Sequence, residues 1–85
     1  MNASALLTIL NANKGMEVDA FAAIESLSPG EYVRMVDSKG KIGIAVYVVD
    51  GYCCINRGYM VTRYDDASRD KKLAKGTIVH VGFDF

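Results

Sequence analysis

The residues of this chain best suited to nucleophilic or metal chemistry are the adjacent pair Cys53 and Cys54 and the single histidine, His80. Neighbouring residues of a strand point to opposite faces of a sheet, so the two thiols are not expected to converge on one ion. A zinc site needs about four ligands, and His80 is the one histidine that can join them. We therefore expect the cysteines to be small packing residues, with a cysteine nucleophile assisted by His80 as the alternative.

The acidic residues Asp65, Asp66 and Asp70 form a second group that can attract a cation. Their spacing lacks the glutamate that closes a calcium-binding loop, so a cation site is the weaker alternative to a solvated loop. The glycines are spread along the chain and do not form a phosphate-binding loop. The sequence therefore predicts no catalytic site, no metal site and no cofactor, and a protein that is not an enzyme.

Tyrosine and arginine are interleaved along the expected strands, and these two residue types are enriched at the energetic centres of protein interfaces. They also stack on bases and contact phosphates in single-stranded nucleic-acid grooves. A third interpretation is that the tyrosines border the core and keep their hydroxyls in water. The residues we predict to contact a partner are Tyr47, Tyr52, Arg57, Tyr59, Arg63, Tyr64, Lys71 and Lys72.

The charge of the chain favours neither a dedicated DNA binder nor an acidic mimic of nucleic acid, because ten basic residues balance ten acidic ones. The distribution is uneven. Residues 1–37 carry two basic and five acidic residues, a net charge of −3, and residues 38–85 carry eight and five, a net charge of +3. The halves either have ordinary solvated faces or present two opposite surfaces that orient a partner.

The N-terminal third of the chain predicts two short helices. Ser4 is a candidate cap for the first, whose leucines repeat at helical spacing, and Gly15 is a suitable end for it. The second helix is expected to begin at the cap Asp19 and to end at residues 28–30, where proline and glycine follow each other. This helical segment, residues 1–28, is expected to pack on a β-rich part formed by residues 31–85, in one domain.

The period of the apolar residues changes to two after residue 30, which is typical of strands. We expect strands at residues 31–36, 41–49, 52–56, 59–64 and 77–85, with a turn at residues 37–40 and a two-residue hairpin at Asp50 and Gly51. Residues 31–56 would then be a three-stranded meander. The strand at residues 41–49 is apolar on both faces, which predicts that it is covered on both. Residues 65–76 are expected to be an exposed loop or a short helix.

Residues 30–46 resemble the KOW-like beginning of small SH3-like barrels. Gly30, Glu31, Val33, Met35, Lys39, Gly40 and Gly43 fit that pattern, although the loop before Lys39 is shorter than the usual one. The resemblance implies a barrel that binds RNA or proteins within transcription or translation assemblies. Together with the strand pattern it predicts an α+β, mostly β fold: two short N-terminal helices followed by a five-stranded antiparallel curved sheet or small SH3-like barrel.

These observations predict a non-enzymatic protein-binding module that modulates or inhibits a larger macromolecular assembly, such as a phage or mobile-element inhibitor of a host enzyme. The alternative is a small SH3-like barrel that binds RNA or another nucleic acid. We expect a protein partner, no membrane contact and a cytoplasmic location, because the longest apolar run is far below the ~20 residues that span a bilayer. A homo-oligomer is compatible with the sequence.

Overall fold

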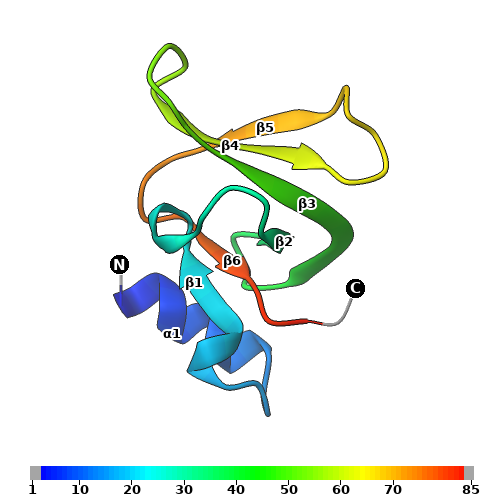
Figure 1. Cartoon of the computed structure of the whole chain (residues 1–85). Helices are drawn as coiled ribbons and strands as arrows, with labels where there is room; N and C mark the ends of the chain where they lie inside the picture. The colour runs from blue at the N-terminus through cyan, green and yellow to red at the C-terminus, as the bar shows by residue number, and fades with distance from the viewer. Residues whose placement is uncertain (1–2, 84–85) are drawn as a thin grey trace.

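One antiparallel sheet of six strands, in the order β1-β6-β2-β3-β4-β5, organises the molecule. The computed structural model describes residues 3–83. A helix precedes the sheet, and short 3₁₀ turns flank β1 (Figure 1). The elements are α1 (Ala3–Ala12), η1 (Val18–Ala20), β1 (Phe21–Ala23), η2 (Ile24–Ser26), β2 (Tyr32–Val36), β3 (Ile42–Cys53), β4 (Gly58–Arg63), β5 (Asp70–Leu73) and β6 (Ile78–His80). The prediction of a mostly β, antiparallel chain is confirmed, but the sheet has six strands where five were expected.

The main core lies on the inner side of the curved sheet. Residues that pair across neighbouring strands face the same side, so Val33 opposite Tyr47 and Val49 opposite Val61 point into one layer. Both ends of the sheet contribute to it, since Leu73 comes from β5 and Val79 from β6. The buried members of this core are Ile24, Val33, Tyr47, Val49, Val61, Leu73 and Val79.

The helix α1 packs against a second, smaller cluster at the β1–β6 end of the sheet, where Ile9 meets Phe21 and Ile78. Its position is fixed by the turn before β3: Asn13 Nδ2 donates a hydrogen bond of 2.6 Å to the carbonyl of Gly40. The helix is confirmed, and Gly15 follows it with φ +90°, as expected of a helix end. The predicted capping role of Ser4 lies outside the described side chains.

The predicted second helix is wrong. Its residues form η1, β1 and η2, and β1 pairs with β6 so that Phe21 lies opposite His80 and Ala23 opposite Ile78. The backbone N–H of Ile24 also donates to the carbonyl of Thr77, at 2.8 Å. A helix of this length is marginal by itself, so pairing with a distant strand determines the conformation of these residues.

The predicted hairpin at Asp50 and Gly51 is also wrong, because β3 runs through both residues. Gly51 has φ +106° at a bulge in the β3–β4 pairing, which is an alternative use of a glycine that adopts positive φ. The chain reverses instead at residues 54–57, where Arg57 has φ +55°. The three-stranded meander therefore consists of β2, β3 and β4 and extends to Arg63.

The polar segment at residues 65–76, expected as a loop or a helix, contains the strand β5. Its residues pair with β4, with Lys72 opposite Met60 and Asp70 opposite Thr62. β5 is an edge strand, and exposed lysine is a common means by which edge strands resist pairing with other chains. The closing strand is shorter than residues 77–85, since β6 ends at His80 and residues 84–85 lie outside the described part.

Candidate functional site

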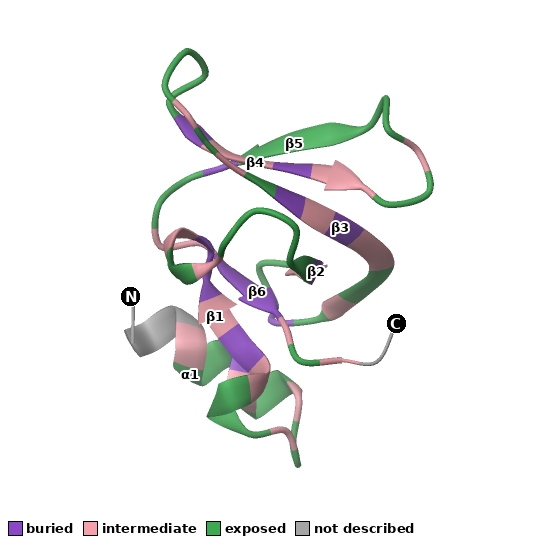
Figure 2. Cartoon of the chain, in the orientation of Figure 1, coloured by how far each residue is buried: buried purple, intermediate pink, exposed green. Residues whose placement is uncertain are grey.

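The long strand β3 bends between an exposed first half and a second half with buried positions (Figure 2). The pairing with β2 is irregular at this point, because the register shifts between Arg34 and Val36. Gly43 lies in the irregular segment, near the carbonyl of Met35. Ile44 is 94% exposed at the bend, although Ala45 and Ile42 in the same half of β3 pack against the main core and the smaller cluster. The prediction that this strand is covered on both faces is therefore wrong.

Apolar and aromatic side chains from three neighbouring strands share the outer side of the sheet beside this bend. Tyr32 pairs opposite Val48, and the N–H of Tyr64 donates to the carbonyl of Val46 at 2.9 Å. The rings of Tyr32 and Tyr64 meet edge to face with centroids 6.0 Å apart, and both residues are exposed. We call this surface the outer face; it consists of Tyr32, Ile44, Val46, Val48 and Tyr64.

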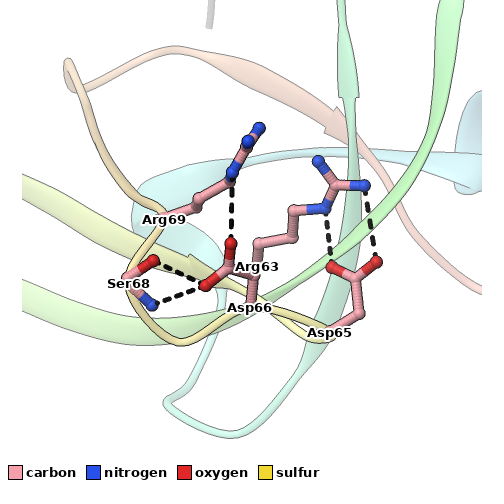
Figure 3. A network of polar contacts seen from close by, with 5 residues as sticks. All are labelled: Arg63, Asp65, Asp66, Ser68 and Arg69. Carbon is pink, nitrogen blue, oxygen red and sulfur yellow. Dashed lines mark hydrogen bonds and ion pairs between the residues drawn. The ribbon is translucent and has the colours of Figure 1, made fainter.

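An open hollow of about 470 Å³ lies where β4 ends and β3 continues. Residues 44–46 line it from β3, and Arg63, Tyr64 and Asp65 line it from the end of β4. The guanidinium of Arg63 contacts both oxygens of Asp65, with Nε at 2.6 Å and an Nη at 3.4 Å (Figure 3). The polar rim of the hollow is thus internally neutralised, and its apolar wall is left for contact.

The turn after this hollow is held by Asp66, which accepts hydrogen bonds from the N–H and the hydroxyl of Ser68 and pairs with Arg69 (Figure 3). These bonds, the Ser68 hydroxyl first, lower the pKa of the Asp66 carboxyl. Asp65 and Asp66 are therefore each occupied by an arginine, while Asp70 lies on β5. Among residues 3–83, no three His, Cys, Asp or Glu side chains are grouped to hold a metal ion.

The residues predicted to bind a partner fall into three separate groups, two of them on the β3–β4 hairpin and at the end of β4. Tyr52 and Tyr59 pair across the β3–β4 hairpin with ring centroids 5.2 Å apart, and Arg57 lies in the turn beside them. The Lys72 side chain lies over Gly58 in the same hairpin. Arg63 and Tyr64 lie at the other end of β4, about 17 Å away along a strand from Tyr59 to Tyr64. The eight predicted residues are thus not one surface.

Two of the predicted residues make contact with each other on the inner side of the sheet. Tyr47 is only 7% exposed and belongs to the main core. The ammonium of Lys71 lies 5.6 Å from the centroid of its ring, which is a cation–π geometry. Tyr47 thus has a packing role, and Lys71 covers its ring from the solvent side.

The sequence prediction missed Tyr32, Ile44, Val46 and Val48 as surface residues. The alternation of apolar residues was visible in the sequence. A strand that is apolar on both faces is, however, predicted to be fully buried when its neighbours are unknown. The signal that could have identified them is Gly43, since a glycine within a strand pattern is typical of a bulge or bend.

The thiol–imidazole alternative is not supported by the geometry. Cys53 is half-buried at the end of β3 and Cys54 is exposed in the following turn; both are free thiols. His80 lies two strands away, opposite Arg34, which in turn pairs with Val46. Val46 and Cys53 are seven residues apart on β3, roughly 20 Å of extended chain.

Comparison with known proteins adds no relationship: no family model matches the chain, and neither the curated proteins nor the solved structures contain a significant match. In the part of the chain that the structure describes, no helix is long and apolar enough to cross a lipid bilayer. The outer face with its hollow is therefore the candidate functional site on the strength of its own geometry.

Proposed function

We propose that this chain is a non-catalytic protein-binding module that modulates or inhibits a larger assembly in the cytoplasm and contacts its partner through the outer face. The observation that carries the proposal is the exposure of Ile44 and Tyr64, 94% and 58%, on opposite walls of one hollow. A fully exposed isoleucine next to exposed tyrosines is costly to keep in water and gains free energy when a partner covers it.

A protein partner fits this surface better than a nucleic acid does. The arginine at the hollow, Arg63, is already paired with Asp65, so it is not available to neutralise a phosphate. The exposed lysines Lys71 and Lys72 lie on the edge strand β5, where protection of the edge is a sufficient reason for them. A protein interface needs only apolar anchors with a neutral or satisfied rim, which the outer face provides.

The order of the strands supports the proposal that this fold is related to a small SH3-like barrel. Five strands are neighbours in the order β6-β2-β3-β4-β5, so that the last strand lies beside the first of the meander. The segment that resembles the KOW pattern, residues 30–46, covers β2, the turn and the exposed half of β3. We infer a variant of a small SH3-like barrel in which β1 extends the sheet by one strand.

The proposal is tested by capture from a lysate of the native host with the immobilised full chain, using three baits in parallel. These are the wild type, the outer-face variant Tyr32→Ala with Tyr64→Ala, and the control Tyr52→Ala in the hairpin. A protein retained by the wild type and by the control, but lost with the outer-face variant, is the expected result. Retention of nucleic acid that falls steeply with salt, or of one protein by all three baits, would overturn the proposal.

A further inference from the structure

The first half of β3 has an open backbone edge. β4 pairs with β3 from Tyr47 onwards, and the bond from the Tyr64 N–H to the Val46 carbonyl is the last one before the chain turns away. No described strand pairs with residues 42–45 on that side of β3. The carbonyl of Lys41 bonds toward β2 and that of Val46 toward β4, so alternation directs the main-chain groups of Ile44 to the open edge.

Two hollows lie beside this edge; by strand alternation, Ile44 and Tyr64 are on the outer side of the sheet, and Lys71, which pairs opposite Val61, is on the inner side. The outer hollow is the one between Ile44 and Tyr64. The second, of about 420 Å³, lies beside residues 41–43 and is lined by Met35, Val36, Asp37 and Lys71 as well. Successive side chains of an added strand point alternately to the two faces, so each hollow can receive every second residue.

We propose that an extended segment of the partner protein, alternating acidic and apolar residues, adds to the sheet as a strand along residues 42–45. This inference rests on the proposed function and names how the partner is recognised. The main-chain groups of β3 supply sequence-independent hydrogen bonds, and the two hollows select side chains. The apolar residues lie against Ile44 and Tyr64 on the outer side.

The charge of the inner hollow selects the acidic residues. Lys41 and Lys71 line it together, and neither is in an ion pair within residues 3–83. Asp37 is the one acidic residue of its lining, and one of its oxygens accepts the N–H groups of Lys39 and Lys41. The lining therefore carries two cations against one carboxylate, a net charge of +1, so a carboxylate of the added strand would be attracted there and a basic side chain repelled.

A second copy of this chain is a poor occupant of the edge. If two copies paired antiparallel about Ile44, Lys41 of one copy would be directed at position 47 of the other, where Arg63 of β4 already occupies the edge. Tyr47 is covered by Lys71 and pairs opposite Arg63, so cations would be brought together. Like charges placed opposite each other in a sheet are destabilising, which favours a foreign acidic segment over self-pairing.

The test uses three synthetic six-residue peptides with capped ends and the ¹⁵N-labelled full chain in NMR titrations. The first alternates glutamate and valine, the second alternates lysine and valine, and the third is the first with alternate amides N-methylated to block strand pairing. We expect saturable shifts and slowed amide exchange at Ile42 and Ile44 with the first peptide alone. Equal binding of the N-methylated peptide, shifts elsewhere on the surface, or no binding would overturn the inference.

Charge reversal supplies a matched variant. In Lys41→Glu with Lys71→Glu, the preference should invert, with the lysine peptide bound roughly tenfold more tightly than the glutamate peptide, the size expected of two partly exposed ion pairs. An unchanged preference for glutamate would contradict the charge argument. The wild-type titrations do not depend on how well this variant folds.

The inference and the proposed function fail separately. If the captured protein depends on Tyr64 but excess glutamate peptide does not displace it, strand addition is wrong and the protein-binding proposal stands. If the peptide binds along residues 42–45 while no captured protein depends on the outer face, strand addition stands and the proposed use of the outer face is wrong.

Discussion

Arg34 and His80 lie directly opposite each other where β2 pairs with β6, and the ring of Phe83 covers both side chains. The guanidinium carbon of Arg34 is 4.3 Å from the centroid of Phe83, and the His80 ring stacks on it at 5.1 Å. Arg34 Nε and His80 Nδ1 are buried, and neither has a hydrogen-bond partner among the described residues. This contact is a place where added charge is costly.

We predict that mild acid destabilises the fold through His80. Burial, and secondarily the charge of Arg34, lowers the pKa of His80 below its usual value of 6.5. In this pH range the imidazole of His80 is protonated in the unfolded chain and neutral in the folded chain. The free energy of unfolding therefore falls as the pH drops from about 6.5 toward the lowered pKa. Urea unfolding between pH 7.5 and pH 5 measures this slope.

The matched variants for this prediction are His80→Phe and Glu25→Gln. His80→Phe keeps a ring between Phe21 and Phe83 and should flatten the slope. The hydrogen bond from the N–H of Gly76 lowers the pKa of Glu25 below 4.5, so Glu25→Gln should lower stability at neutral pH and alter its pH dependence only below about pH 4.5, which leaves the slope near pH 6 unchanged. A slope near pH 6 that persists in His80→Phe would rule out His80 as its origin.

We predict that Gly40→Ala is one of the most destabilising small substitutions in the turn region. Gly40 has φ +85°, and an added Cβ would lie 2.9 Å from the Cα of Ile9. Backbone strain and the clash together should cost about 2–4 kcal/mol of unfolding free energy. Gly30→Ala is the control: it has φ +94° with open space around the Cβ, and should cost about 1 kcal/mol. Equal losses in the two variants would contradict the close packing of α1 on this turn.

We predict that the double variant Cys53→Ser with Cys54→Ser retains partner binding. Neither thiol is fully buried, so the change in unfolding free energy should be below about 1 kcal/mol. Chemical denaturation gives the stability, and the capture experiment gives the binding. If the double variant folds but no longer retains the partner, the prediction is wrong and at least one of the two thiols is a functional group.

We predict that Tyr64→Ala weakens binding of the captured partner by about 2 kcal/mol, because an aromatic anchor at the centre of an interface has an effect of this size. Tyr64→Phe should retain most of the affinity, since the ring makes the apolar contact. Tyr52→Ala serves as the matched tyrosine outside the outer face. Calorimetric titration of the four proteins against the partner checks the order, and a larger loss at Tyr52 would move the interface to the hairpin.

We predict that Lys72→Thr with Lys75→Thr promotes self-association without a change in the salt dependence of partner binding. The edge strand β5 loses a protective charge at Lys72, and threonine favours strand pairing. Light scattering measures the self-association. A salt slope of log affinity that shrinks by roughly 0.7–0.9 for each lost lysine would instead identify these residues as phosphate contacts.

Local patterns predicted those parts of the fold whose conformation is determined by neighbouring residues. The turn before β3 is one: the Gly40 N–H donates to the Asp37 carbonyl, and Asp37 holds the N–H groups of Lys39 and Lys41. The helix α1 and the strands β2 and β4 also follow from the spacing of apolar residues within each segment. In all of these, the interactions that decide the structure are a few residues apart.

The remaining elements were decided by partners distant in sequence. Residues 21–23 have the composition of a helix, but their backbone forms antiparallel strand pairs with β6. Gly51 has a turn signature, but pairing with Met60 makes it a bulge. β5 forms because β4 presents an edge that would otherwise be unpaired.

The candidate site depends both on local sequence patterns and on contacts between residues that are distant in sequence. The sequence by itself determined that this is a mostly β chain and that Arg63 lies on a strand; Tyr64, expected on the same strand, lies in the turn that follows β4. Only the tertiary structure decided that Tyr47 is buried, that Tyr52 and Tyr64 belong to different surfaces, and that Ile44 is exposed. Exposure depends on what covers a residue, and the bend of β3 away from β4 is a property of the whole sheet, which no short segment specifies.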